Sequence, residues 1–123
     1  MAQTVSFSSD RIDERTQILT LDGKCGVSTA LEAEQQIAAA LDAGTTEIIF
    51  DLRGVSTLGS SVLHVLVRGL VRTKERTGRF VLVRPNAHVW ALFESNGLDR
   101  VFGSFPDLKD AMAKPPRQQA ASS

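Results

Sequence analysis

The stretch Glu47–Leu66 reads EIIFDLRGVSTLGSSVLHVL, and it decides the fold. Its first five residues, Glu47–Asp51, are rich in β-branched and aromatic side chains, which predicts a buried central strand. A glycine-containing loop then leads to a helix that extends to about Thr77, and apolar residues cover most of its circumference. Phe80–Val83 predicts another buried strand. The two strands should be parallel, with a right-handed crossover through the helix.

Toward the N-terminus, two segments predict a hairpin. Val5 and Phe7 alternate with polar neighbours, and Thr16–Leu21 alternates more clearly. The polar residues between positions 9 and 13 predict the turn that joins them. Three residues are expected to end the second strand: Asp22, Gly23 and Gly26.

A first helix is expected over Ala30–Ala43. Thr29 and Glu32 have the spacing of a capping box, in which each side chain accepts from a free backbone N–H of the first turn. Gly44 occupies the position of a C-terminal stop. The predicted buried stripe of this helix consists of Leu31, Ile37, Ala38 and Leu41.

The C-terminal part predicts a helix over Ala87–Ser95, a short strand at Val101 and Phe102, and a last helix over Asp107–Ala113. The chain is therefore expected to be one α/β domain over residues 1–113, with helices packed against a mixed central sheet. Residues 114–123, KPPRQQAASS, contain no core-forming side chains and predict a disordered tail.

The composition narrows the functional classes. Fourteen basic residues balance fourteen acidic ones, so no overall attraction to nucleic acid or to an anionic membrane is expected. The basic run from Arg68 to Arg79 favours a solvated face. Cys25 is the single cysteine and excludes an intrachain disulfide. With no signal-peptide pattern and no long apolar run, the chain is expected to be cytoplasmic and not membrane-bound.

No constellation for catalysis or metal binding is visible. His64 and His88 are the only histidines, and no dinucleotide, phosphate-loop or nucleophile-elbow motif occurs. We therefore expect no enzyme activity, no metal and no cofactor, and a structural role for His64 within its apolar helix. Asp51, expected at the end of the central strand, is expected to hydrogen-bond the loop that follows it.

Two adjacent serines, Ser60 and Ser61, stand at the predicted start of the second helix of the chain. One serine suffices to cap a helix, which stabilises it by about 1 kcal/mol. The other would project at the helix N-terminus, where backbone N–H groups and the helix dipole favour an added anion. Phosphorylation there would add nearly two negative charges and could block a docking surface.

In this order of elements, the chain resembles the STAS domain of bacterial anti-sigma factor antagonists. The resemblance covers about Thr16–Ala113, and the stretch RPNAHVWALFESNGLDRVF with the following DLKDAMA carries it most specifically. It implies partner switching. A protein of this family binds an anti-sigma factor that is usually also a serine kinase of the histidine-kinase-like ATPase type. The kinase phosphorylates a serine and weakens binding, and a serine phosphatase restores it.

Matched residue by residue, the resemblance places the phosphorylated serine at Ser61, with Ser60 as second choice. Gly59 stands where the family has an aspartate, Val62 replaces a glycine, and Gly26 stands where an aspartate is common. The expected partner-binding set is Gly26, Leu58, Gly59, Ser60, Ser61, Val62 and Leu63.

Two other classes of function remain. The missing aspartates favour a STAS adaptor that is not phosphorylated, such as a scaffold or a subunit of another complex, including a lipid-transport machine. A small enzyme would need a pocket with convergent polar groups. The first hairpin could also leave an edge that pairs in a homodimer.

Overall fold

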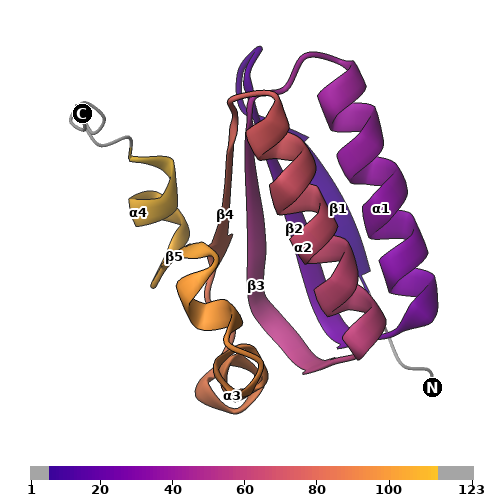
Figure 1. The fold of residues 1–123 in the computed structure, drawn as a ribbon, viewed down its shortest axis with the longest axis vertical. Coiled ribbons are helices and arrows are strands. Elements are labelled where there is room, and N and C mark those ends of the chain that lie inside the picture. Colours follow the sequence, from indigo (N-terminus) through magenta and orange to yellow (C-terminus); the bar gives the residue numbers. More distant parts are fainter. Residues whose placement is uncertain (1–5, 114–123) are drawn as a thin grey trace.

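In the computed structural model, residues 6–113 are described, and they form a mixed five-stranded sheet (Figure 1). The strands follow one another across the sheet in chain order. β1 is antiparallel to β2, and the remaining neighbours are parallel. Their bounds are β1 Ser6–Arg11, β2 Thr16–Cys25, β3 Glu47–Leu58, β4 Arg79–Val83 and β5 Gly103–Phe105.

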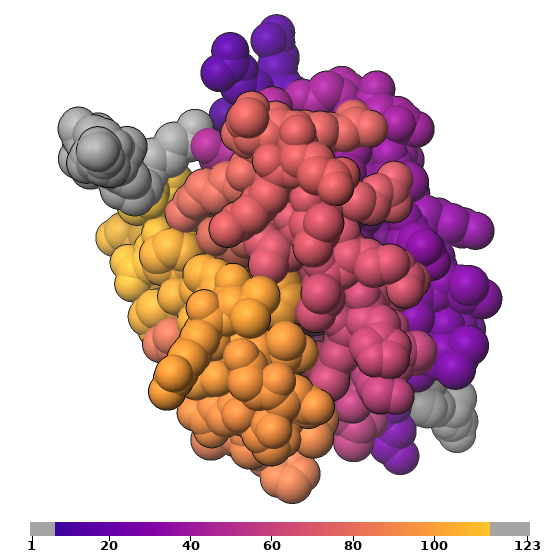
Figure 2. All heavy atoms as spheres, viewed as in Figure 1, coloured from indigo at the N-terminus to yellow at the C-terminus, as the bar shows by residue number. Residues whose placement is uncertain are grey.

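Two long helices lie side by side over one face of the sheet (Figure 1). In the space-filling view, the orange and yellow segment that contains α3 and α4 lies next to α2, on the side away from α1 (Figure 2). The helices are α1 Val27–Asp42, α2 Ser60–Glu75, α3 Ala87–Ser95 and α4 Leu108–Met112, with a short 3-10 turn at Leu98–Arg100. The predicted α/β fold with a mixed sheet is confirmed.

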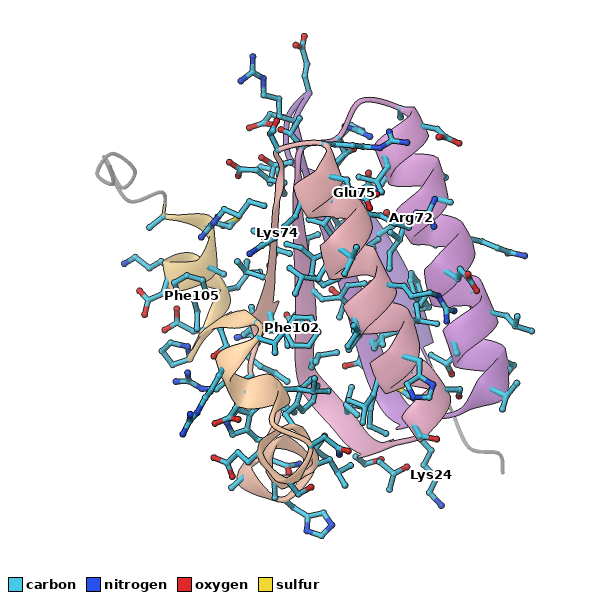
Figure 3. The ribbon with its side chains drawn as sticks, in the orientation of Figure 1. Lys24, Arg72, Lys74, Glu75, Phe102 and Phe105 are labelled. Carbon is cyan, nitrogen blue, oxygen red and sulfur yellow. The ribbon has the colours of Figure 1, made fainter. Side chains whose placement is uncertain are left out.

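Two apolar clusters hold the layers together. The larger lies between the sheet and α1, α2 and α3, and the smaller lies on the other face beneath α4. The larger cluster contains a series of aromatic contacts centred on Phe50, whose ring is 6.4 Å from Phe7 and 5.9 Å from Phe80. Phe102 continues the series beside Phe80 and Phe93 (Figure 3).

The hairpin, the parallel crossover and the third helix agree with the sequence prediction, but two strands are longer. β2 continues to Cys25 and β3 continues through Gly54 to Leu58. Asp22 and Gly23 were wrongly expected to end β2, and Gly54 was wrongly placed in a loop after β3, whereas Gly26 does follow the last residue of β2. Asp22 pairs with Gly54 at a register shift, and the side chain of Asp22 fills the space that a Cβ of Gly54 would occupy. The glycine therefore permits pairing there.

The first helix begins three residues earlier than predicted. The amide of Ala30 donates to Gly26 O at 2.9 Å, so Gly26 is the N-cap and Thr29 is buried inside the first turn. The predicted capping box is therefore wrong. The helix buries Ala33 and Ile37, but Leu31 is 59% exposed rather than part of the buried stripe.

Two smaller predictions also need correction. The hairpin turn falls after Arg11, where Asp13 Oδ1 accepts from the amides of Arg15 and Thr16. The final strand is Gly103–Phe105, two residues later than predicted, because the 3-10 turn takes up the preceding residues. The expected tail at 114–123 lies outside the described residues.

Candidate functional site

α1 and α2 begin next to each other because β2 and β3 end in register. Cys25 pairs with Leu58, and the next amide, that of Gly59, donates to Cys25 O at 2.8 Å. Gly26 is the N-cap of α1 and Gly59 is the N-cap of α2. The sheet thus brings two helix N-termini together at one edge of the fold.

Neither N-terminus has a side-chain cap. Gly59 occupies the capping position, so the expectation that one of the two serines caps α2 is wrong, and Ser60 and Ser61 are its first two helical residues. The first turns of α1 and α2 contain no acidic residue. Backbone amides and both helix dipoles therefore make this surface favourable for negative charge.

The predicted site residues divide into an outer and an inner layer. Ser60 and Gly26 are exposed and Ser61 is half-buried. Val62 is completely buried, and Leu58 and Leu63 are almost so. The inner residues therefore hold the start of α2 onto the core. Val62, which was expected to contact a partner, is instead buried against the core.

A groove of about 170 Å³ between α1 and α2 adjoins Ser61. Its mouth is apolar, since Val27 is 69% exposed and Leu31 is 59% exposed. We call this the α1–α2 groove; its lining residues are Val27, Ala30, Leu31, Glu34, Ser61, His64, Val65 and Arg68.

Sequence reasoning missed most of this groove. His64 is exposed on α2, so the structural role expected for it inside an apolar helix is wrong. Val27 was not placed on a helix at all. Because α1 begins at Val27, Val27 and Leu31 lie one turn apart on the same face. Their four-residue spacing in the sequence could have predicted the apolar side of the groove.

A larger hollow of about 380 Å³ lies on the other side of the start of α2. It is formed where β3 extends beyond β4 and meets α3. Its lining residues are Ser56, Thr57, Leu58, His88, Val89, Ala91, Leu92 and Ser95. Leu58 therefore lies between this hollow and the paired helix starts.

Cys25 lies at the same edge but is not available as a nucleophile. Its side chain is buried, and its sulfur donates weakly to Gly23 O at 3.6 Å. Burial, with a further contribution from Asp22, raises the pKa of the Cys25 thiol to about 11. The thiol therefore stays protonated at neutral pH.

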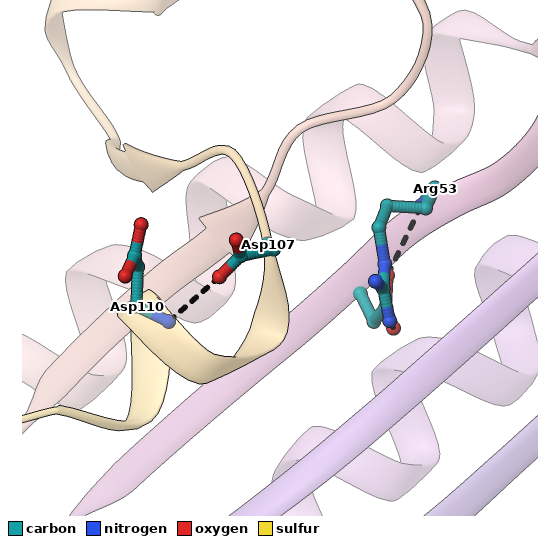
Figure 4. Close-up of polar contacts among 4 residues, drawn as sticks. Arg53, Asp107 and Asp110 are labelled. Carbon is teal, nitrogen blue, oxygen red and sulfur yellow. Dashed lines mark hydrogen bonds and ion pairs between the residues drawn. The ribbon is translucent and has the colours of Figure 1, made fainter.

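Asp51 has a structural role, as predicted, but it lies inside β3 and bonds a later residue of the same strand rather than a loop that follows it. Its carboxylate accepts from the amide and Nε of Arg53 and forms an ion pair with Arg53 Nη2 at 2.9 Å (Figure 4). The hydrogen bond to Asp51 raises the pKa of Arg53 above its ordinary value. Both acceptor oxygens of Asp51 are thus engaged by the residue two positions later.

The basic run does not form one face. Arg68 pairs with Glu34 at 3.4 Å, and Arg76 donates to Leu41 O at 2.9 Å. Arg79 donates to Ala111 O.

Within residues 6–113 no group of three potential metal ligands converges. Over the same residues, no helix has both the length and the apolar character that crossing a bilayer requires.

Substitution of Gly59 tests whether a carboxylate at this position, where the family has an aspartate, would cap α2. A Cβ at Gly59 would lie 3.4 Å from Cys25 O, an ordinary contact, and the backbone is already extended as in a capped helix. We expect Gly59→Asp to raise the free energy of unfolding by about 0.5 kcal/mol, because aspartate accepts from the first-turn amides. Urea denaturation measures the change, with Gly59→Ala as the uncapped control. A destabilised aspartate variant would contradict this geometry.

Comparison with known proteins agrees with this architecture. Residues 9–111 match the model of the STAS domain. A Bordetella bronchiseptica protein, BtrV, whose name describes it as an anti-sigma factor antagonist, is 26% identical over 98 residues, which cover 80% of this chain and 84% of BtrV.

Solved structures show the same fold. An anti-sigma factor antagonist from Mycobacterium paratuberculosis has a TM-score of 0.77 at 25% identity, covering 89% of this chain and 92% of that one. Unphosphorylated SpoIIAA has a TM-score of 0.78 at 19% identity, covering 87% and 93%. The phosphorylated Bacillus SpoIIAA has a TM-score of 0.72 at 18% identity, covering 87% and 96%. Like the solved proteins just described, whose structure titles call them anti-sigma factor antagonists or SpoIIAA, the chain has this fold, and it belongs to the STAS domain family.

Proposed function

We propose that this protein binds an anti-sigma factor through the surface around the starts of α1 and α2, and that phosphorylation of Ser61 releases it. The observation that carries the proposal is the position of Ser61. It lies at the second residue of α2, and it lines a groove whose mouth is apolar. A charge added at Ser61 would thus lie beside the exposed apolar side chains of Val27 and Leu31.

The helix start explains how the surface could change without refolding. A phosphoryl group adds nearly two negative charges and three acceptor oxygens. Free amides and the dipoles at the paired N-termini stabilise that charge, so the phosphorylated domain should keep its fold. The exposed side chains of Val27 and Leu31 would then border an anion, and an apolar partner surface would lose affinity.

Membership of the STAS family supports the partner class that we infer. We infer an anti-sigma factor that is also a serine kinase of the histidine-kinase-like ATPase type, with a serine phosphatase reversing the modification. One protein of the same fold, SpoIIAA, has been solved in unphosphorylated and phosphorylated forms, which supports a switch that leaves the fold intact. Ser60, exposed and one position earlier, is the second candidate for the modified residue.

We expect Ser61→Asp to weaken binding to the anti-sigma factor about tenfold or more, because a fixed carboxylate puts charge beside the apolar mouth. The partner is first captured with the wild-type protein and identified as an ATPase by mass spectrometry. Calorimetric titration with the purified partner then measures affinity. Ser61→Asn is the matched neutral control and should bind nearly as wild type, and Ser60→Asp tests the neighbouring serine.

Equal affinity of Ser61→Asp and wild type would exclude a charge-driven switch at Ser61. The second candidate function, a STAS adaptor that is not phosphorylated, is favoured by the glycine caps at Gly26 and Gly59, where the family has aspartates. An adaptor predicts a partner that is not a kinase, and affinities that do not distinguish Ser61→Asp from Ser61→Asn.

A further inference from the structure

Ser61, His64 and Arg68 line the same side of the α1–α2 groove. Their spacing of three and four residues places them on successive turns of one helix face. Helical side chains lean toward the N-terminus, so the imidazole of His64 leans back toward Ser61. A group attached to Ser61 Oγ and the ring of His64 therefore share one part of the groove.

His64 is exposed, and within residues 6–113 no hydrogen bond or ion pair engages its ring. Arg68 differs, because its guanidinium already pairs with Glu34 of α1 at 3.4 Å. Glu34 and Arg68 are the acidic and the basic residue besides His64 among the eight that line the groove, and they pair with each other. His64 is the uncommitted donor beside Ser61.

We propose that His64 binds the phosphoryl group of phosphorylated Ser61 and holds it inside the α1–α2 groove. This inference rests on the proposed function, since it concerns the modified form of the same serine. An imidazole presents at least one N–H donor in either protonation state, and its protonated form adds a positive charge. The phosphoryl group then covers Val27 and Leu31 instead of extending into solvent.

Lys24 is the alternative partner for the phosphoryl group. It pairs with Thr57 near the ends of β2 and β3, so it lies at the same edge of the fold as the start of α2. In Figure 3 its side chain extends away from the helices at that edge. A phosphoryl group bound by Lys24 would point out of the groove, so Lys24 and His64 define two distinguishable positions.

The test uses phosphoserine installed genetically at position 61 of the full chain, which requires no native kinase or partner. The phosphorus resonance is followed by NMR as a function of pH, and its midpoint reports the second ionisation of the phosphoryl group. A nearby imidazolium favours the dianion and lowers this midpoint. We expect His64→Gln to raise the midpoint by about 0.3 pH unit, the size of an exposed ion pair on a helix.

Two variants serve as matched controls. His88→Gln removes the other histidine, which lines the separate hollow beside α3, and should leave the midpoint unchanged. Lys24→Gln should also leave it unchanged. A midpoint that does not move in His64→Gln, or that moves as much in Lys24→Gln, overturns the proposal. Because no partner is present, either result is independent of the Ser61→Asp affinity test.

Discussion

Replacing Phe50 with alanine is expected to lower the free energy of unfolding by about 4 kcal/mol. Phe50 lies on the central strand β3, and its side chain is fully buried. Its ring contacts Phe7 at an edge-to-face angle of 88° and Phe80 at 36°. Truncation removes both ring contacts and leaves a cavity between the sheet and the helices, and close-packed neighbours can collapse into it only partly.

Chemical denaturation followed by circular dichroism measures this loss. Leu31→Ala is the control, because Leu31 is mostly exposed and its truncation should change the unfolding free energy by no more than about 0.5 kcal/mol. A loss below about 2 kcal/mol for Phe50→Ala would show that the ring is less completely enclosed than the structure indicates.

Gly78→Ala is expected to lower the free energy of unfolding by about 3 kcal/mol. A Cβ at Gly78 would lie 2.5 Å from Thr46 O and 2.8 Å from Thr73 Cγ2. The backbone cannot easily move away, since the amide of Gly78 donates to Thr73 O at 2.8 Å and the amide of Arg79 donates to Thr46 O at 2.7 Å. The connection between α2 and β4 would have to break one of these bonds.

Thermal denaturation of Gly78→Ala and Gly103→Ala distinguishes a backbone collision from the general effect of replacing a glycine. At Gly103 a Cβ would meet only the end of the Val81 side chain, at 3.3 Å. We expect a loss below about 1 kcal/mol there. Equal losses in the two variants would contradict the proposed collision at Thr46.

The sequence predicted the elements whose pattern is strong and local. The apolar run before Asp51 and the helical periodicity that ends at Gly44 were sufficient to locate β3 and α1, although not the C-terminal end of β3 or the start of α1. It failed where a tertiary contact changes the meaning of a residue. A glycine usually weakens a strand. At Gly54, however, the absence of a Cβ leaves the space that the side chain of Asp22 occupies.

Only part of the candidate site could be predicted, because the rest depends on how two helices pack together. The serines were correctly placed at the start of α2, although the N-cap is Gly59 and not one of them. The α1–α2 groove was not predicted, because it depends on the phase of α1. Thr29 and Glu32 have the spacing of a capping box but do not form one. Because the prediction relied on that spacing, it started the helix at Ala30 and missed the exposed face that contains Val27 and Leu31.

The hydrogen bond from the Gly59 amide to Cys25 O ties the two helix starts to one another through the sheet. The surface at this edge is therefore preorganised, and its residues should lose little conformational entropy when a partner binds. Recognition should then proceed as docking of rigid bodies, and its rate should depend on charge and collision rather than on a slow rearrangement of this domain.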